Sequence, residues 1–260
     1  MGYWIDTHSH LSDEGFRNDP EGYLSRAKDN NVRHIIAISC NRSDWEWNLR
    51  LADQNPDIDV AAGFYPGDVQ DFTEEDWEEL HEILKDGRIL AVGEIGLDYY
   101  WDKTYMELQK ASFIRQIEWA NELDKPVLIH CRDAYEDTYE ILKAHPVKRG
   151  VLFHCYSGSK EMAVQFMTLP FEVNFAFGGT LTYKNNVRAK ETVKYLPLER
   201  IMLETDSPYL SPQKYRGQKN ESKNVRYVGE YMAELKGIAE EELQDACRKN
   251  FERFFKKELK

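Results

Sequence analysis

Residues 88–131, "RILAVGEIGLDYYWDKTYMELQKASFIRQIEWANELDKPVLIHC", contain a complete strand–helix–strand unit. Its ends, "RILAVGEI" (88–95) and "KPVLIHC" (125–131), are short apolar runs typical of buried strands. Between them Phe113, Ile114 and Ile117 recur at helical spacing, and Thr104 with Glu107 predicts a capping box at the helix start. Buried strands joined by a helix are the repeating unit of a parallel α/β fold.

The same alternation continues toward both ends of the chain. The other candidate strands are "YWIDTH" (3–8), "RHIIAIS" (33–39), "DVAAGFY" (59–65), "GVLFHC" (150–155), "FEVNFAFGG" (171–179) and "RIMLETD" (200–206). Two further helices are expected at 222–235 and 240–255. Eight such units in 260 residues predict one (β/α)8 TIM barrel over residues 1–260, with a doubly wound open sheet as the main alternative.

Composition limits the class of partner. The formal charge of −12 argues against a broad basic face for gripping DNA, although it leaves room for a local phosphate site. The four cysteines show no C-x-x-C spacing and are expected to be reduced thiols. There is no signal-peptide pattern and no apolar run of about 18 residues, so we expect a cytoplasmic protein without a membrane partner. No obligate protein partner is evident.

Polar side chains interrupt the apolar pattern where the predicted strands end. In "WIDTHSH" (4–10), Asp6, His8 and His10 occupy every second position, so in an extended strand they share one face. Four other strand ends carry Glu94, His130, His154 and Asp206. The remaining histidines, His34, His81 and His145, occupy surface-like places and are interpreted as non-functional. Because active sites of such barrels form at the C-terminal strand ends, these groups predict a site there.

Four imidazoles and two carboxylates supply more ligands than one tetrahedral ion can use, so we expect two divalent ions. One ion is assigned His8, His10, Glu94 and Asp206, and the other is assigned Glu94, His130 and His154. Glu94 would bridge the ions, and Asp206 would also hold or deprotonate the attacking water. The nitrogen-rich set favours zinc, manganese or iron over magnesium without fixing the metal.

Two further residues have open roles. Asp6 either completes the ligand set or orients a ligand histidine from outside it. Arg132 shares the inward side of its strand with His130, where it either contacts a phosphate or pairs with Asp133 or another acid.

In order along the chain, "DTHSH", "GEIGLDYY", "IHCRDA", "FHCYSG", "GG", "ETDSPYL" and "RGQKNES" resemble the motifs of the TatD-type metal-dependent deoxyribonucleases. The resemblance covers nearly the whole length. It implies a (β/α)8 barrel, two catalytic ions on the six ligands above, and hydrolysis of DNA as a 3′-to-5′ exonuclease preferring single strands. Two positions depart from the family: Tyr65 in "GFYPGD" replaces a histidine, and Ser222 replaces a proline.

The predicted site could serve three functions. In the first, DNA phosphodiester hydrolysis, the basic Lys214–Arg226 loop holds the nucleotide backbone, with Arg216 and Glu221 as candidate substrate or supporting residues, and Tyr65 donates a hydrogen bond to phosphate. Tyr99, Tyr100 and Trp101 either stack on exposed bases or pack the rim. The second is carbonyl ester or amide hydrolysis, such as D-aminoacyl-tRNA deacylation. The third is a non-catalytic metal-binding barrel.

Overall fold

The computed structural model describes residues 2–259, and its core is an eight-stranded parallel sheet in the order β1 to β8. The strands are β1 (Trp4–Ser9), β2 (Val32–Ser39), β3 (Ile58–Ala62), β4 (Ile89–Asp98), β5 (Val127–Arg132), β6 (Val151–Phe153), β7 (Val173–Phe177) and β8 (Ile201–Leu203). The helices are α1 (Glu14–Arg17), α2 (Pro20–Asp29), α3 (Arg42–Gln54), α4 (Glu74–Leu84), α5 (Met106–Glu122), α6 (Tyr135–Ala144), α7 (Lys160–Phe166), α8 (Val187–Tyr195), α9 (Val225–Lys236) and α10 (Glu240–Phe255).

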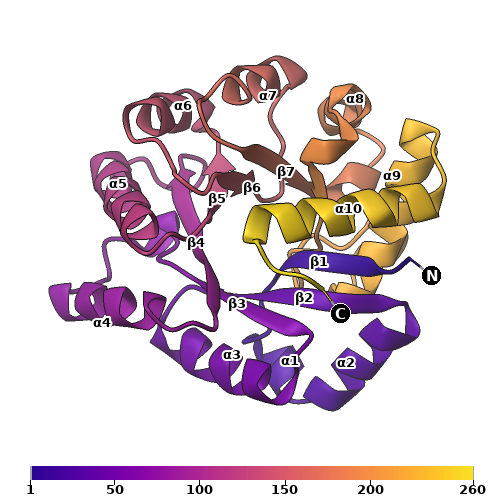
Figure 1. Ribbon diagram of the computed structural model, residues 1–260, viewed down its shortest axis with the longest axis horizontal. Coiled ribbons are helices and arrows are strands. Elements are labelled where there is room, and N and C mark those ends of the chain that lie inside the picture. The colour runs from indigo at the N-terminus through magenta and orange to yellow at the C-terminus, as the bar shows by residue number, and fades with distance from the viewer. Residues whose placement is uncertain (1, 260) are drawn as a thin grey trace.

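The sheet curls round until its first and last strands meet. Thr7 Oγ1 donates to the Leu203 carbonyl over 3.0 Å, and a parallel bridge joins Ser9 to Ser207 just beyond β8. Helices surround the strands in Figure 1. The predicted (β/α)8 barrel is therefore confirmed. None of the helices described within residues 2–259 is both long and apolar enough to cross a membrane.

The helix between β4 and β5 starts later than the sequence predicts. Tyr105 caps α5 without a side-chain hydrogen bond, and Met106 is the first helical residue. The capping box expected from Thr104 and Glu107 is wrong, because the Thr104 N–H donates to Asp102 in the preceding turn. The predicted helix at 222–235 is a 3₁₀ turn over Ser222–Asn224 followed by α9.

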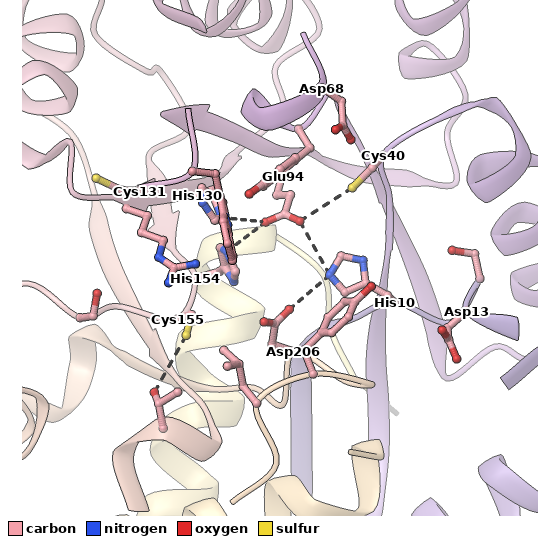
Figure 2. A pocket seen from close by; sticks show the side chains of 18 of the residues that line it. His10, Asp13, Cys40, Asp68, Glu94, His130, Cys131, His154, Cys155 and Asp206 are labelled. Atoms are coloured by element: carbon pink, nitrogen blue, oxygen red, sulfur yellow. Dashed lines mark hydrogen bonds and ion pairs between the residues drawn. The ribbon is translucent and has the colours of Figure 1, made fainter. Parts of the chain in front are cut away.

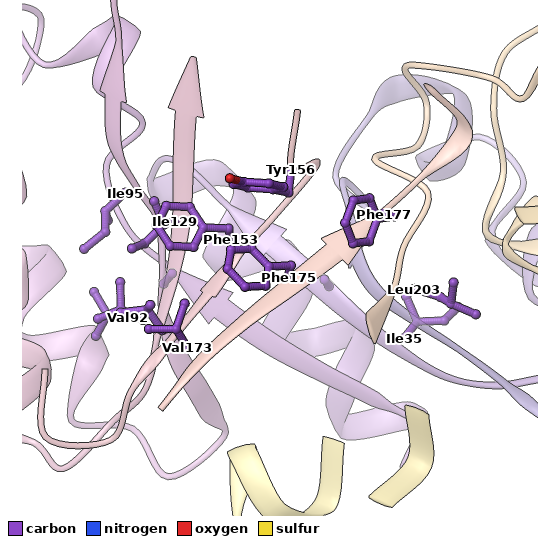
Figure 3. Packing of buried hydrophobic residues seen from close by; sticks show 14 of the residues in the cluster. Ile35, Val92, Ile95, Ile129, Phe153, Tyr156, Val173, Phe175, Phe177 and Leu203 are labelled. Atoms are coloured by element: carbon purple, nitrogen blue, oxygen red, sulfur yellow. The ribbon is translucent and has the colours of Figure 1, made fainter. Parts of the chain in front are cut away.

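Two apolar layers hold the barrel together. The outer layer lies between sheet and helices, and Figure 3 shows the part formed by Phe153, Phe175 and Phe177 of β6 and β7. The inner layer comes from alternate strand positions: Ile36, Ile38, Ala61, Leu128, Leu152, Ala176 and Met202. Because successive strand residues face opposite sides, His130 and His154 follow Leu128 and Leu152 on the same inner face.

Helix α10 closes the end of the barrel opposite these histidines. Phe251, Phe254 and Phe255 pack against the inner apolar layer, and α10 lies across the strands in Figure 1. Beside this floor His34 Nε2 lies 2.7 Å from Asp59 Oδ2, and Lys257 pairs with Asp59 Oδ1. His34 is only 4% exposed, so its expected surface-like place is wrong. It packs edge-on against Phe251 instead.

Candidate metal centre

The six predicted ligands meet at the open end of the barrel, around a cavity of about 980 Å³ lined by five of them. His8 and His10 come from β1 and the residue after it, Glu94 from β4 and His130 from β5. His154 and Asp206 lie just after β6 and β8, which end slightly earlier than predicted. Figure 2 shows His10, Glu94, His130, His154 and Asp206 converging on the cavity.

The close approach between β4 and β5 requires a glycine at one position. Gly96 has φ of 141°, a conformation that side chains rarely adopt. A Cβ placed on Gly96 would also meet the His130 carbonyl oxygen at 2.0 Å. The glycine thus lets the strand that carries Glu94 lie tightly against the strand that carries His130.

Glu94 occupies the middle of the group. Its Oε2 lies 2.9 Å from His154 Nε2, 3.4 Å from His130 Nδ1 and 3.8 Å from His8 Nε2. Its Oε1 lies 3.7 Å from His10 Nε2. Each carboxylate oxygen thus faces one or more of the four imidazoles, which is the placement expected of a carboxylate shared by two ions.

The side chain of Asp206 faces the two histidines of the first strand. Asp206 Oδ1 is 3.2 Å from His10 Nε2 and 3.7 Å from His8 Nε2. Its backbone has φ of 57°, and its N–H donates to the His8 carbonyl over 2.9 Å. This left-handed turn, which Asp tolerates better than most residues, aims the carboxylate back across the barrel mouth.

Donor atoms within 4.8 Å of one another form three groups: His8, His10 and Glu94; Glu94, His130 and His154; and His8, His154 and Asp206. The first two contain most of one predicted ligand set and all of the other, and Glu94 belongs to both. The third adds a short link between the sets. The structure thus brings all six predicted ligands together in one cluster.

Buried atoms without hydrogen-bond partners show that this cluster suits divalent ions. Both ring nitrogens of His8 and Oε2 of Glu94 are buried and make no hydrogen bond among the described residues. Native proteins rarely leave such atoms unpaired. Burial and the neighbouring His154 lower the pKa of His8 well below its usual value. The resulting neutral imidazole is the form that binds metal.

The other charges balance within the cluster. Burial disfavours ionised Glu94, but the imidazoles of His154 and His130 outweigh it and hold the pKa of Glu94 well below its usual range. Burial likewise disfavours charged His154, yet the carboxylates of Glu94 and Glu204 raise its pKa well above normal. A carboxylate stabilised in its ionised form among imidazoles provides the negative charge that a cation needs.

Two carboxylates that the sequence analysis did not single out lie behind ligand histidines, Asp98 at hydrogen-bond distance and Glu204 at ion-pair distance. Asp98 Oδ2 lies 2.9 Å from His130 Nε2, and Glu204 Oε1 lies 3.7 Å from His154 Nδ1. The nitrogen left facing Glu94 is Nδ1 in His130 and Nε2 in His154. Asp98 and Glu204 lie at even spacing from Glu94 and Asp206 within "GEIGLD" and "LETD", and this spacing was the available signal.

Asp6 lies outside the group of possible ligand atoms. Its carboxylate accepts hydrogen bonds from the Thr205 N–H and hydroxyl, at 2.9 and 2.6 Å, and from the His8 N–H at 3.3 Å. Burial raises its pKa to about 7, although these hydrogen bonds lower it in part. Asp6 therefore joins β1 to the segment between β8 and Asp206, and of its two expected roles the supporting one fits this position.

The hydroxyl of Tyr65 points at a neighbouring carboxylate. It donates to Asp98 Oδ2 over 3.0 Å, and its ring packs edge-on against His130 at 4.9 Å. This hydroxyl lines the cavity, and its expected hydrogen bond to a substrate phosphate stays a prediction. Burial and the charge of Asp98 raise the pKa of Tyr65, so it remains a neutral donor.

Arg132 lines the cavity beside His130. Its guanidinium lies 3.7 Å from the ring centre of Tyr100 and 5.3 Å from that of Trp101. Within residues 2–259 it forms no ion pair, so the expected alternative of pairing with Asp133 does not occur. Tyr99 is 6% exposed and donates to Asp137, which makes it a packing residue rather than a base-stacking one.

The basic loop at residues 214–226 is largely neutralised by local pairs. Lys219, Lys223 and Arg226 pair with Asp13, Glu221 and Glu230. Glu221 also accepts from Arg26 over 2.8 Å, so it acts in this ionic network away from the cavity lining.

The other two cations of the loop lie against aromatic rings. Lys214 Nζ lies 5.4 Å from the ring centre of Tyr215, and the guanidinium of Arg216 lies 5.2 Å from that of Tyr183, which lines the cavity. Of the loop's cations, Arg216 therefore lies beside a residue of the cavity lining, and its expected contact with substrate stays a prediction. Ser222, at the family's proline position, is buried. Its hydroxyl donates to the Ser9 hydroxyl over 3.3 Å, and its N–H donates to the Tyr23 hydroxyl over 2.8 Å.

Comparison with known proteins gives one consistent result. The family model "TatD related DNase" matches residues 5–256. An uncharacterized metal-dependent hydrolase of Bacillus subtilis, YabD, is 38% identical over 253 residues, covering 97% of this chain and 98% of its own. Its Escherichia coli counterpart YcfH is 34% identical over 257 residues, covering 97% and 96%. The crystal structure of YjjV, a TatD homologue of E. coli, superposes with a TM-score of 0.92 at 30% identity and covers 98% of both chains.

Proposed function

The chain belongs to the TatD-related DNase family of metal-dependent hydrolases, and we propose that it hydrolyses phosphodiester bonds of DNA, as a 3′-to-5′ exonuclease preferring single strands. The observation that carries the proposal is the central Glu94, shared by two groups of possible ligands at the mouth of a large cavity. Phosphodiester hydrolysis is a common task of centres with two neighbouring ions.

We assign the two ions to the predicted ligand sets. His8, His10, Glu94 and Asp206 would hold one ion, and Glu94, His130 and His154 the other. Bound together, zinc or manganese ions would polarise the scissile phosphate and supply a hydroxide at neutral pH. Magnesium suits the imidazole-rich set less well.

The protein's own groups position the reactants. Asp206 faces the cavity and, beyond ligation, is placed to accept a proton from the attacking water. Arg132 offers guanidinium donors without a competing carboxylate, which supports an anionic substrate. Asp98 orients the His130 ring through a hydrogen bond, and the Glu204 carboxylate lies 3.7 Å from the His154 nitrogen that faces away from Glu94.

Carbonyl ester or amide hydrolysis, including deacylation of D-aminoacyl-tRNA, is the competing function. Many binuclear amide hydrolases carry a carboxylated lysine on the fourth strand, whereas this chain has Glu94 there. The unpaired Arg132 suits a phosphate of either DNA or tRNA, so the choice between these two functions rests on Glu94. Against a non-catalytic metal-binding barrel, the intact ligands line a cavity large enough for a substrate.

The test incubates the protein with single-stranded DNA labelled at its 3′ or 5′ end, beside a D-aminoacyl-tRNA, in manganese or magnesium. We expect early loss of the 3′ label and stepwise shortening of the 5′-labelled strand. Deacylation without any loss of labelled DNA would overturn the proposal.

Glu94→Gln is expected to abolish cleavage, because it removes the shared carboxylate. The matched control is Glu78→Gln on the exposed face of α4, which should behave as wild type. Metal content and a circular dichroism spectrum, both measured on each variant, separate loss of the ions from loss of the fold.

A further inference from the structure

Charge is distributed unevenly around the cavity. Asp13, Asp44 and Asp68 line it after β1, β2 and β3. Figure 2 shows Asp13 and Asp68 on the side away from Cys131 and Cys155. Asp13 and Asp44 have basic neighbours, but Asp68 pairs with no cation among the described residues. The DNA phosphate next to the scissile one would therefore be repelled from the side of the cavity lined by these aspartates.

The opposite side offers a cation in a fixed position. Arg132 projects inward two residues beyond His130, and the face of Tyr100 holds its guanidinium at 3.7 Å. Stacking restricts the side chain without using its hydrogen-bond donors. With no ion pair to break, an incoming phosphate meets donors that are already oriented.

An exposed aromatic ring lies directly beside this cation. Trp101 is 72% exposed, lines the cavity, and packs edge-on against Tyr100 at 4.8 Å between ring centres. An indole this exposed gains little from packing within the protein. Unpaired bases stack on such rings regardless of sequence.

We infer that Arg132, Tyr100 and Trp101 form a clamp for the nucleotide next to the scissile bond, with Arg132 binding its phosphate and Trp101 stacking on its base. The inference rests on the proposed function and specifies the path of the strand. DNA leaves the metal centre over β4 and β5, and the segments after β1 to β3 face the terminal nucleoside. A duplex cannot use the clamp unless its end is frayed, because paired bases do not present a free face.

The test combines protein variants with altered substrates. Trp101→Ala and Arg132→Met are assayed on a short single-stranded oligonucleotide, with Tyr195→Ala and Lys194→Met on α8 as matched controls outside the cavity lining. We expect the clamp variants to raise KM roughly tenfold with little change in kcat. Bis(p-nitrophenyl) phosphate has no neighbouring nucleotide, so the rise in KM of the clamp variants over wild type should be much smaller on this substrate than on the oligonucleotide.

Altered DNA tells contact from structural damage. Removing the base beside the scissile bond should raise the KM of the wild type as much as the Trp101→Ala substitution does. It should not raise the KM of Trp101→Ala any further. An uncharged methylphosphonate at the neighbouring linkage should raise the KM of the wild type as much as Arg132→Met does, and should not raise the KM of Arg132→Met any further.

Equal losses of the clamp variants on normal and altered DNA would overturn the clamp, as would a rise in KM on bis(p-nitrophenyl) phosphate as large as the rise on DNA. A wild-type protein that hydrolyses bis(p-nitrophenyl) phosphate but no DNA would instead overturn the proposed function.

Discussion

Replacing Asp98 by asparagine is expected to weaken binding of the ion assigned to Glu94, His130 and His154. Asp98 Oδ2 accepts from His130 Nε2 at 2.9 Å and from the Tyr65 hydroxyl at 3.0 Å, and Oδ1 accepts from the Tyr100 N–H at 2.9 Å. Asparagine has one side-chain oxygen, whereas both oxygens of Asp98 accept hydrogen bonds. Whichever way the amide turns, its NH₂ faces a group that donates in the wild type.

The magnitude follows from which bond is lost. If the NH₂ faces His130, the ring must accept at Nε2 and carry its proton on Nδ1, the nitrogen that faces Glu94. Loss of such a supporting carboxylate typically costs about 10- to 100-fold in metal affinity, or about 1.4–2.7 kcal/mol. If the NH₂ faces the Tyr100 N–H instead, two donors meet without an acceptor between them, which costs about 1–3 kcal/mol of folding stability.

The assay is calorimetric titration of the metal-free protein with zinc, with urea unfolding of the same samples. Asp137→Asn is the matched control, because Asp137 accepts from the Tyr99 hydroxyl at 2.7 Å without contacting a ligand histidine. Nitrogen-15 shifts of the histidine rings report the tautomer directly. A folded Asp98→Asn variant with wild-type affinity, stability and ring shifts would refute the reasoning.

Three other outcomes are expected. Tyr65→Phe removes one hydrogen-bond donor from Asp98 and should lower the free energy of unfolding by about 1–2 kcal/mol in urea titrations. Tyr65→His, the family residue, should restore part of this loss. A Tyr65→Phe variant as stable as wild type would show that the hydrogen bond contributes nothing to stability. Burial opposes the ionised form of Asp59, but His34 and Lys257 outweigh it and lower the pKa of Asp59 in the folded protein. The stability that Asp59 contributes is therefore complete above its pKa in the unfolded chain, about 3.9, and disappears as the pH falls through its lower pKa in the folded protein. The stability difference between wild type and Asp59→Asn, measured without metal, should therefore shrink below about pH 4, and a constant difference would contradict the pairing. Adding zinc at about 100 times its Kd should raise the midpoint of thermal unfolding by about 5–10 °C over a chelated sample, and equal midpoints would argue against metal binding by the folded state.

The period-two pattern of the strands explains why so much of the site was predictable. His8 and His10 project to one side, and His130 and His154 continue inner faces begun by Leu128 and Leu152. Each ligand could therefore be placed from its own strand, without knowledge of its neighbours. The barrel then brings the strand ends together, as the structure shows around Glu94.

The residues that sequence reasoning missed depend on partners from other strands. Asp98 matters because His130 lies across the β4–β5 ladder, and Tyr65 of the β3 loop reaches the same oxygen. His34 looked surface-like because its own segment does not reveal that Asp59 and α10 cover it. Thr104 and Glu107 had the right spacing for a cap, but Asp102 takes the Thr104 N–H in the turn before α5.

The floor made by α10 has a consequence for biosynthesis. The apolar interior is completed by Phe251, Phe254 and Phe255, which pack against residues as early as Ile5 and emerge from the ribosome long after β8. The strands cannot fully bury their inner faces until α10 has left the ribosome, so closure of the barrel must follow the emergence of α10. A premature stop just before α10 should therefore yield an aggregation-prone chain rather than an enzyme lacking one helix.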